Sequence, residues 1–432
     1  MNANTQLDRR LADYLAGRST FRAPEGLLES TMARVDGAGQ RGWLRIVRPV
    51  SPSPTWLPAV RRGVGLAVAV GLMLVLFVLL ALAVGSRRPV VAPLGLARPG
   101  LIAFEAGNRI YVANADGSGK HPITLGPALD SYPAWSHDGT RVAYISQRVA
   151  SAPFEVRVAD AQGTNQIVVA TGLSYANTAA GTCCEAPALD WSRDDRWLVF
   201  AAATDETREP RIVVASADGS SQWTLGTSDL GGLDPTWSPD GKEIAFARVA
   251  PEPSIWVVSA DGSGLHRLTT VRGEGDSFYR PQWSPDGRRL AFQAGSEGDL
   301  GIYLINRDGS DEHPVDDAIR ACRSCISSDA TMPVWSPDGS ALAWLGLTSQ
   351  AEIAGLIVVG DSDGLHPRVI YEGPLQPTPL IWSPDARHLL AHSPASDHTP
   401  KLLIVDVTGQ TQPVAIPAEE TYANASWQRL PP

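Results

Sequence analysis

The sequence predicts an all-β protein, a β-propeller of seven four-stranded blades, from three observations. A tryptophan followed by a Ser-Pro-Asp-Gly-like turn recurs along the chain, and an apolar strand followed by Asp-Gly recurs between the copies. Successive tryptophans of this kind are 45 to 56 residues apart, close to the roughly 40–50 residues of a four-stranded propeller blade. One such unit cannot bury its apolar faces alone, so the copies must stack on one another.

The clearest copy of the repeat is the hairpin around Trp283. A short strand ends at this tryptophan, Ser-Pro-Asp-Gly reverses the chain, and residues 290–293 leave as a second strand. Proline presets φ for the first corner of a type I turn, and glycine accepts the positive φ that follows. Asp195 and Ala386 replace the turn glycine in two copies, so we expect those turns to be looser or of a different type. The tryptophans that anchor the blades are Trp135, Trp191, Trp237, Trp283, Trp335, Trp382 and Trp427.

The closing blade follows from the order of the strands. Six of the seven tryptophans begin a complete set of four strands. The chain before the first set supplies three strands, at residues 101–104, 109–113 and 121–125, and the chain after the sixth set supplies one, around 423–428. We expect these amino- and carboxyl-terminal strands to share the seventh blade, which would also protect the sheet edges that an open ring exposes.

Three further regions precede the propeller. Residues 1–62 contain ten arginines against five acidic residues and two helical patterns, which predicts a basic cytoplasmic segment with two short helices. Residues 63–85 are 23 uncharged residues rich in leucine and valine, long enough to cross a hydrocarbon core of about 30 Å. A cleaved signal peptide is the alternative, but the long leader favours a membrane helix. Residues 86–99 are a tether, and 100–432 form the propeller.

The basic residues set the expected orientation. Arginines are more frequent before the predicted span than after it, which places the amino end in the cytoplasm and the propeller outside it. The net charge of −10 argues against nucleic acid as a partner, because nucleic-acid binding requires a basic surface. Residues 1–62 could be a solvated leader or could bind a cytoplasmic partner, and both interpretations stay open.

The repeat resembles the WD40-like propeller repeat of TolB-type proteins over about residues 100–429. The resemblance rests on the seven tryptophans in register and on the turn that follows most of them. It implies the propeller fold and a role in protein contacts. It does not imply an enzymatic activity.

Four cysteines lie in the two longest connections between a fourth strand and the next first strand. They are Cys183, Cys184, Cys322 and Cys325. Outside the cytoplasm, we expect disulfides, with all three pairings open. A four-thiolate zinc site and free thiols are the alternatives, although two adjacent cysteines are poor ligand spacing for zinc.

We predict no catalytic residue, no metal site and no cofactor. Residues 360–364 match the Gly-x-Ser-x-Gly nucleophile elbow, but they align with the Asp-Gly turn of the other blades, so we expect them to be structural. His388 and His392 lie on one side of a predicted strand, with His398 after it. A metal site at these histidines is an alternative.

The binding residues are expected on one face of the propeller. The connections from a fourth strand to the next first strand vary in length and emerge on what we call the upper face, opposite the uniform Ser-Pro-Asp-Gly turns of the lower face. Variable loops on a rigid scaffold are where binding residues concentrate. The predicted binding-face residues are Tyr175, Glu185, Arg272, Asp276, Phe278, Tyr279, Arg280 and Arg320. Phe278 and Tyr279 are expected to be exposed anchors whose loss weakens binding with little change in stability.

The sequence therefore predicts a membrane-anchored, non-enzymatic binding or sensing module of the cell envelope. Its upper face would meet an envelope protein, a peptide or a glycan. The alternative is a polysaccharide lyase or hydrolase with its site at the channel mouth. The upper loops carry acidic residues but almost no histidine, which favours the binding module.

Overall fold

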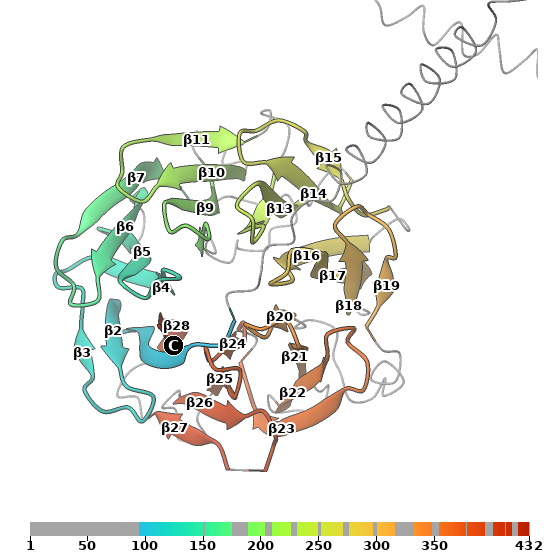
Figure 1. Cartoon of the computed structure of the whole chain (residues 1–432). Helices are drawn as coiled ribbons and strands as arrows, with labels where there is room; N and C mark the ends of the chain where they lie inside the picture. The colour runs from blue at the N-terminus through green and yellow to red at the C-terminus, as the bar shows by residue number, and fades with distance from the viewer. Residues whose placement is uncertain are drawn as a thin grey trace, which may run out of the picture. The chain divides into compact units, whose positions relative to one another are not determined.

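The computed structural model describes residues 95–149, 152–174, 189–203, 210–225, 231–248, 252–270, 276–296, 300–315, 332–347, 354–376, 378–393, 401–410, 412–416 and 422–431. In this part of the chain, 28 strands form seven four-stranded antiparallel sheets arranged in a ring as blades (Figure 1). The predicted helices within residues 1–62 and the predicted span at 63–85 lie outside the described residues. No helix among the described residues is long and apolar enough to cross a membrane.

In each blade the strands pair with their neighbours from the inside of the ring outward, and in six of the seven blades they are consecutive in the chain. Blades 1 and 2 are β4 (Leu129–Trp135), β5 (Arg141–Gln147), β6 (Phe154–Asp160) and β7 (Ile167–Leu173), then β8 (Asp190–Trp191), β9 (Trp197–Ala202), β10 (Arg211–Ser216) and β11 (Gln222–Leu225). Blades 3 and 4 are β12 (Leu233–Trp237), β13 (Glu243–Arg248), β14 (Ser254–Ser259) and β15 (His266–Arg267), then β16 (Asp276–Trp283), β17 (Arg289–Ser296), β18 (Gly301–Asn306) and β19 (His313–Pro314). Blades 5 and 6 are β20 (Val334–Trp335), β21 (Ala341–Leu347), β22 (Ala354–Asp361) and β23 (Arg368–Pro374), then β24 (Ile381–Trp382), β25 (His388–Ser393), β26 (Lys401–Asp406) and β27 (Val414–Ile416). Blade 7 is β28 (Tyr422–Leu430), β1 (Arg98–Ala106), β2 (Arg109–Ala113) and β3 (His121–Pro122).

Blade 7 is built from both ends of the propeller, as predicted. β28 pairs antiparallel with β1, and Trp427 lies opposite Ile102 in the register. Gln428 links the closing strand to its neighbours, because its amide oxygen accepts the Leu101 N–H at 2.8 Å and its amide nitrogen donates to the Gly139 carbonyl at 2.7 Å. The seven-bladed fold with a shared closing blade is confirmed.

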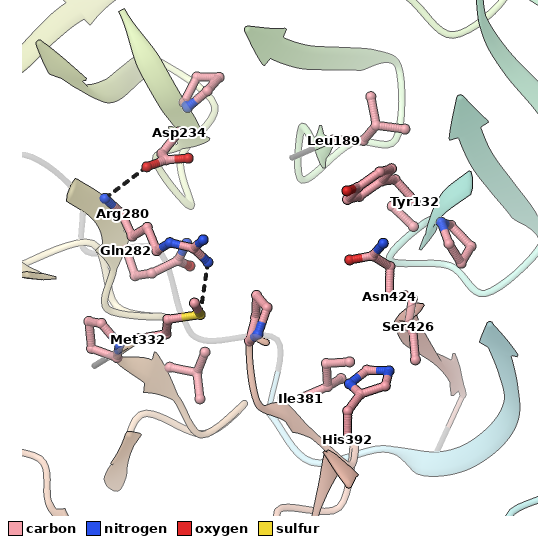
Figure 2. Close-up of a pocket in the computed structure, with 17 residues that line it drawn as sticks. Tyr132, Leu189, Asp234, Arg280, Gln282, Met332, Ile381, His392, Asn424 and Ser426 are labelled. Atoms are coloured by element: carbon pink, nitrogen blue, oxygen red, sulfur yellow. Dashed lines mark hydrogen bonds between the residues drawn. The ribbon is translucent and has the colours of Figure 1, made fainter. Parts of the chain in front are cut away.

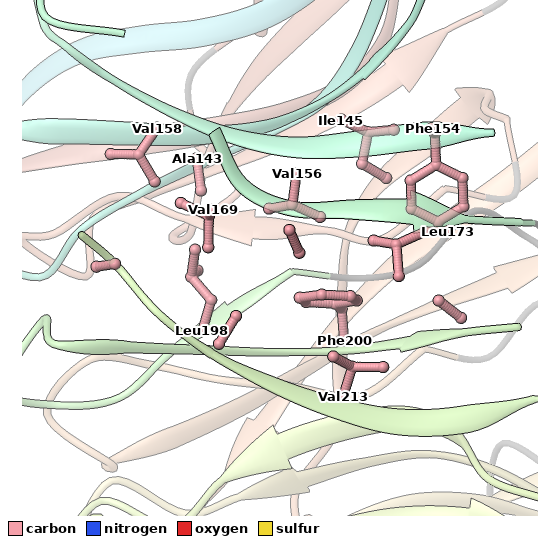
Figure 3. Packing of buried hydrophobic residues seen from close by; sticks show 14 of the residues in the cluster. Ala143, Ile145, Phe154, Val156, Val158, Val169, Leu173, Leu198, Phe200 and Val213 are labelled. Carbon is pink, nitrogen blue, oxygen red and sulfur yellow. The ribbon is translucent and has the colours of Figure 1, made fainter. Parts of the chain in front are cut away.

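The hydrophobic core is divided among the blade interfaces. Among the described residues, seven clusters of buried apolar side chains each bridge two neighbouring blades, including the pairs on both sides of blade 7. Figure 3 shows the cluster between blades 1 and 2, where Val156 and Phe154 on β6 meet Phe200 on β9. Each anchor tryptophan is at most 9% exposed and packs on the blade before it. The tryptophans therefore join blades rather than stabilise only their own hairpins.

The lower-face turns are held by a buried serine. In all six Trp-Ser turns that the structure describes, the serine hydroxyl donates to the aspartate two residues later at 2.5–2.7 Å. The same hydroxyl accepts the N–H five residues later at 2.9–3.0 Å. A single buried serine hydroxyl thus forms hydrogen bonds with both the turn aspartate and the start of the second strand.

The two turns that lack glycine have the same geometry as the others, so the expectation of a looser or different turn is wrong. Asp195 donates its N–H to Ser192 at 2.8 Å, and Ala386 donates to Ser383 at 2.9 Å, as Gly139 does to Ser136 at 3.0 Å. Both replacements adopt the left-handed backbone, with φ of 55° and 56°. The serine hydrogen bonds hold the turn in that conformation despite the side chain.

Replacing each of these residues with glycine is expected to change stability in opposite directions. Ala386→Gly should stabilise the fold by about 1 kcal/mol, because the left-handed conformation is strained for a residue with a Cβ atom. Asp195→Gly should destabilise it by about 1–3 kcal/mol, because the Asp195 carboxylate accepts the N–H groups of His137 and Asp138 at 2.7 and 2.9 Å and so ties blade 2 to blade 1. Urea unfolding of both variants measures the change in the free energy of unfolding, which should be an increase for Ala386→Gly and a decrease for Asp195→Gly. A shift in the same direction for both would contradict this role for the carboxylate.

Candidate functional site

The innermost strands of four blades carry a β-bulge at the same place in the repeat. The pairing register of β4, β12, β16 and β28 shifts by one residue just before the anchor tryptophan. The residue three positions before the tryptophan has positive φ in each case. These residues are Tyr132 (56°), Asp234 (50°), Arg280 (52°) and Asn424 (44°). A bulge leaves one residue out of the ladder and redirects its side chain, and non-glycine residues with positive φ are strained.

A proline follows the bulged residue in three of these strands. Pro133, Pro235 and Pro281 stand two positions before their tryptophans. Because proline has no N–H, it cannot donate to the ladder at this point. Proline at this position is the sequence signal that could have located the bulges.

The four bulged side chains line one cavity inside the ring, with a volume of about 300 Å³ (Figure 2). Figure 2 shows Asp234 and Arg280 on one side of this cavity, with Tyr132 and Asn424 opposite. The remaining lining residues are Pro133, Ala134, Leu189, Pro235, Gln282, Met332, Pro333, Val334, Pro379, Ile381, His392, Ala425 and Ser426. We call this space the channel cavity.

Two charged residues of the channel cavity have shifted pKa values. Burial raises the pKa of Asp234 to about 6, although its carboxylate accepts the backbone N–H of Arg280 at 3.2 Å, which acts in the opposite direction. Burial lowers the pKa of Arg280 to about 10, so this guanidinium keeps its positive charge at neutral pH. The guanidinium extends away from Asp234 and donates to the sulfur of Met332 at 2.8 Å (Figure 2).

His392 adds a neutral polar group to the cavity wall. Its side chain is 3% exposed, and burial lowers its pKa to about 4. Nδ1 is 2.8 Å from the Thr378 hydroxyl, while Nε2 has no hydrogen-bond partner among the described residues. Behind the cavity, Asn424 donates to Glu105 at 3.3 Å, and burial raises the pKa of that carboxyl. A buried polar atom without a partner can be satisfied by a water molecule or by a ligand group.

Three of the predicted binding-face residues lie near this site but have different roles. Phe278 is 1% exposed and belongs to the core between blades 3 and 4, so its prediction as an exposed anchor is wrong. The chain from Asp276 onward is the strand β16 rather than a loop, and strand pairing turns Phe278 into the core. Tyr279 is partly exposed, and Arg280 lines the channel cavity.

The other predicted site residues cannot be placed in the same way. The side chain of Asp276 is not described. Tyr175, Glu185, Arg272, Arg320, Cys183, Cys184, Cys322 and Cys325 lie outside the described residues. Their roles in binding, and the disulfides, stay predictions.

Two motifs of the sequence have a structural explanation. Residues 360–364 end β22 and form a turn to β23, in which Gly364 donates its N–H to Asp361 at 2.9 Å. A nucleophile elbow joins a strand to a helix, so this segment is structural, as predicted. His388 and His392 begin and nearly end the same strand, β25, and residues four apart in a strand are about 13 Å apart. These two histidines therefore cannot share one metal ion.

Known proteins share this fold at low sequence identity. The oligogalacturonate lyase from Vibrio parahaemolyticus is 16% identical, with a TM-score of 0.54 over 72% of this chain and 86% of that chain. The tricorn protease is 13% identical, with a TM-score of 0.53 over 77% of this chain and 35% of that chain. TolB from Acinetobacter baumannii is 17% identical, with a TM-score of 0.47 over 76% of this chain and 66% of that chain. No curated protein sequence matches the chain.

The two likenesses with TM-scores above 0.5 show the fold alone, because proteins with different activities share it at these identities. A family model gives the more specific result. The model of the TolB beta propeller domain matches residues 139–430, which include six of the seven anchor tryptophans. The chain therefore belongs to the TolB beta propeller domain family.

Proposed function

We propose that the chain is a non-enzymatic binding module whose channel cavity and surrounding upper face hold a protein or peptide ligand. The observation that carries the proposal is the ring of bulged side chains. Four innermost strands hold Tyr132, Asp234, Arg280 and Asn424 in strained backbone that presents them to one cavity. Strain of this kind clusters at ligand sites. Membership of the TolB propeller family supports a role in protein contacts.

We also propose that residues 63–85 anchor the chain in the cell membrane, with 1–62 in the cytoplasm and the propeller in the cell envelope. The support is the uncharged stretch of 23 residues and the excess of arginine before it. Protease added to cells stripped of their outer layers should remove the propeller and leave 1–62 protected. Protection of the propeller would reverse the proposed orientation.

A lyase or hydrolase acting at the channel mouth is the alternative function. Its support is His392, whose Nε2 lies in the wall of the channel cavity and has no hydrogen-bond partner among the described residues. However, a histidine with a pKa of about 4 is a weak general base at neutral pH. The binding module therefore remains the better-supported function.

Capture of ligands from an envelope extract on the full-length chain tests the proposal. The double variant Asp234→Asn with Arg280→Gln is expected to lose a partner that the wild type retains, because it removes both charges of the cavity. Lys242→Gln with Arg288→Gln is the matched control, since both residues are exposed beside the lower-face turns. If only the control variant loses the partner, binding occurs on the lower face and the proposed face is wrong. Turnover of polygalacturonate by the wild type would favour the enzymatic alternative.

A further inference from the structure

Among the described residues, the lining of the channel cavity combines a half-buried arginine with a mostly apolar wall. Ten of its 17 lining residues are proline, alanine, leucine, methionine, valine or isoleucine, and four of these are prolines. Among the described lining residues, Arg280 is the one arginine and lysine is absent. A half-open cavity of about 300 Å³ with a few convergent polar groups has the composition of a small-ligand site.

The placement of Arg280 has two separate costs. Its guanidinium is largely removed from water, which disfavours the charge enough to lower its pKa to about 10. Its backbone has a φ of 52°, a conformation that most side chains avoid. The fork of N–H donors on arginine fits a carboxylate with two parallel hydrogen bonds. An anionic ligand with this geometry would offset the first cost.

His392 supplies a second, independent hydrogen-bonding atom for the same ligand. Its Nε2 is buried and without a partner among the described residues, and the residue lines the same cavity (Figure 2). The end of a peptide chain carries an amide group next to its carboxylate, whereas most of its remaining surface is an apolar side chain. A sugar acid instead carries several hydroxyl groups, each of which needs a polar partner, whereas ten of the 17 lining residues are apolar.

We infer that the channel cavity binds the free carboxyl end of a peptide chain, with the carboxylate at Arg280 and the last side chain against the proline-rich wall. This inference rests on the binding function proposed above and names its ligand class. The last residue of the bound peptide enters the cavity.

Binding of a carboxylate at this place is expected to strengthen as the pH falls from 7.5 to 5. Asp234 carries a negative charge above its pKa of about 6 and is neutral below it, so the carboxylate that opposes the ligand is lost on acidification. Across this range Arg280 stays cationic and His392 stays neutral. The remaining ionisable groups nearby are Tyr132, which faces Arg280, and Glu105 behind Asn424, whose pKa burial also raises.

Calorimetric titration of the full-length chain with N-acetyl-leucine, N-acetyl-leucinamide and galacturonate tests the inference. The acid should bind about tenfold more tightly than the amide, which lacks the charge. Arg280→Gln should remove this difference, and Arg280→Lys should restore part of it. Asp234→Asn should bind the acid at pH 7.5 as tightly as the wild type does at pH 5, which separates Asp234 from Glu105. Melting temperatures close to that of the wild type show that the variants fold.

Equal affinity for the acid and the amide would overturn the inference, and so would tighter binding of galacturonate than of N-acetyl-leucine. Unchanged discrimination in Arg280→Gln would overturn it as well. If these small probes fail while the double variant of the cavity still loses its envelope partner, the carboxyl-end inference fails and the binding function stands. If that double variant retains its partner, the binding function itself fails.

Discussion

Deletion of residues 422–432 is expected to leave a chain that no longer unfolds cooperatively. The deletion removes β28, so that blade 7 loses its innermost strand and β1 becomes an open edge. It also removes Trp427 from the core between blades 6 and 7. Loss of one buried tryptophan side chain alone costs about 3–5 kcal/mol, and a folded domain is stable by only about 5–15 kcal/mol. The truncated propeller should therefore have too small a free energy of unfolding to stay fully folded.

Thermal melting followed by circular dichroism measures this effect. The wild type should give one sharp transition, and the truncated chain a broad one. A synthetic peptide of residues 417–432, added in trans, should restore the sharp transition, whereas the same peptide with Trp427→Ala should not. A truncated chain that melts as sharply as the full-length chain would show that the closing strand is dispensable.

Phe278→Ala is expected to destabilise the fold by about 3–5 kcal/mol, the usual cost of removing a buried phenylalanine side chain. Phe278 is 1% exposed and stacks on Phe292, with the ring centroids 6.1 Å apart. The substitution leaves a cavity in the core between blades 3 and 4. Urea unfolding monitored by tryptophan fluorescence gives the change in the free energy of unfolding.

Tyr279→Ala is the matched control for this prediction. The two aromatic residues are adjacent in β16, but Tyr279 is partly exposed, so its loss should change stability by less than that of Phe278. Similar losses of stability for the two variants would contradict the assignment of Phe278 to the core.

The order of the repeats was enough to predict the fold and its closure. Each tryptophan marks one innermost strand, so counting strands before Trp135 and after the sixth blade leaves three and one, and the structure pairs them as β28 with β1. This part of the prediction needed only local turn chemistry and the requirement that no sheet edge stay open.

The bulges explain why the candidate site could not be predicted in the same way. Phe278 and Trp283 are five residues apart, so in an unbroken strand they would point to opposite faces. The extra residue at Arg280 changes the alternation, and both aromatic side chains enter the core between blades 3 and 4. The same bulge turns Arg280 to the channel cavity. Positive φ at arginine or tyrosine is rare, so the residue type alone does not predict a bulge at these positions.

The repeat pattern in the sequence also could not predict contacts between neighbouring repeats. The Asp195 carboxylate binds the turn at His137, which is 58 positions earlier in the chain. A pattern of turns shows that glycine is missing at 195, but it does not show which neighbouring turn its replacement reaches.

The closing blade also determines how the propeller responds to mechanical load. Ala97, just before β1, donates its N–H to the carbonyl of Pro384 in a lower-face turn at 2.9 Å, and β1 then runs between β28 and β2 (Figure 1). Tension applied through the amino end therefore acts along a strand that is paired on both sides. The hydrogen bonds of both ladders lie across that strand and would be sheared together, whereas an edge strand such as β3 would be peeled away one bond at a time. A pull on the amino end of β1 is thus resisted by two ladders at once.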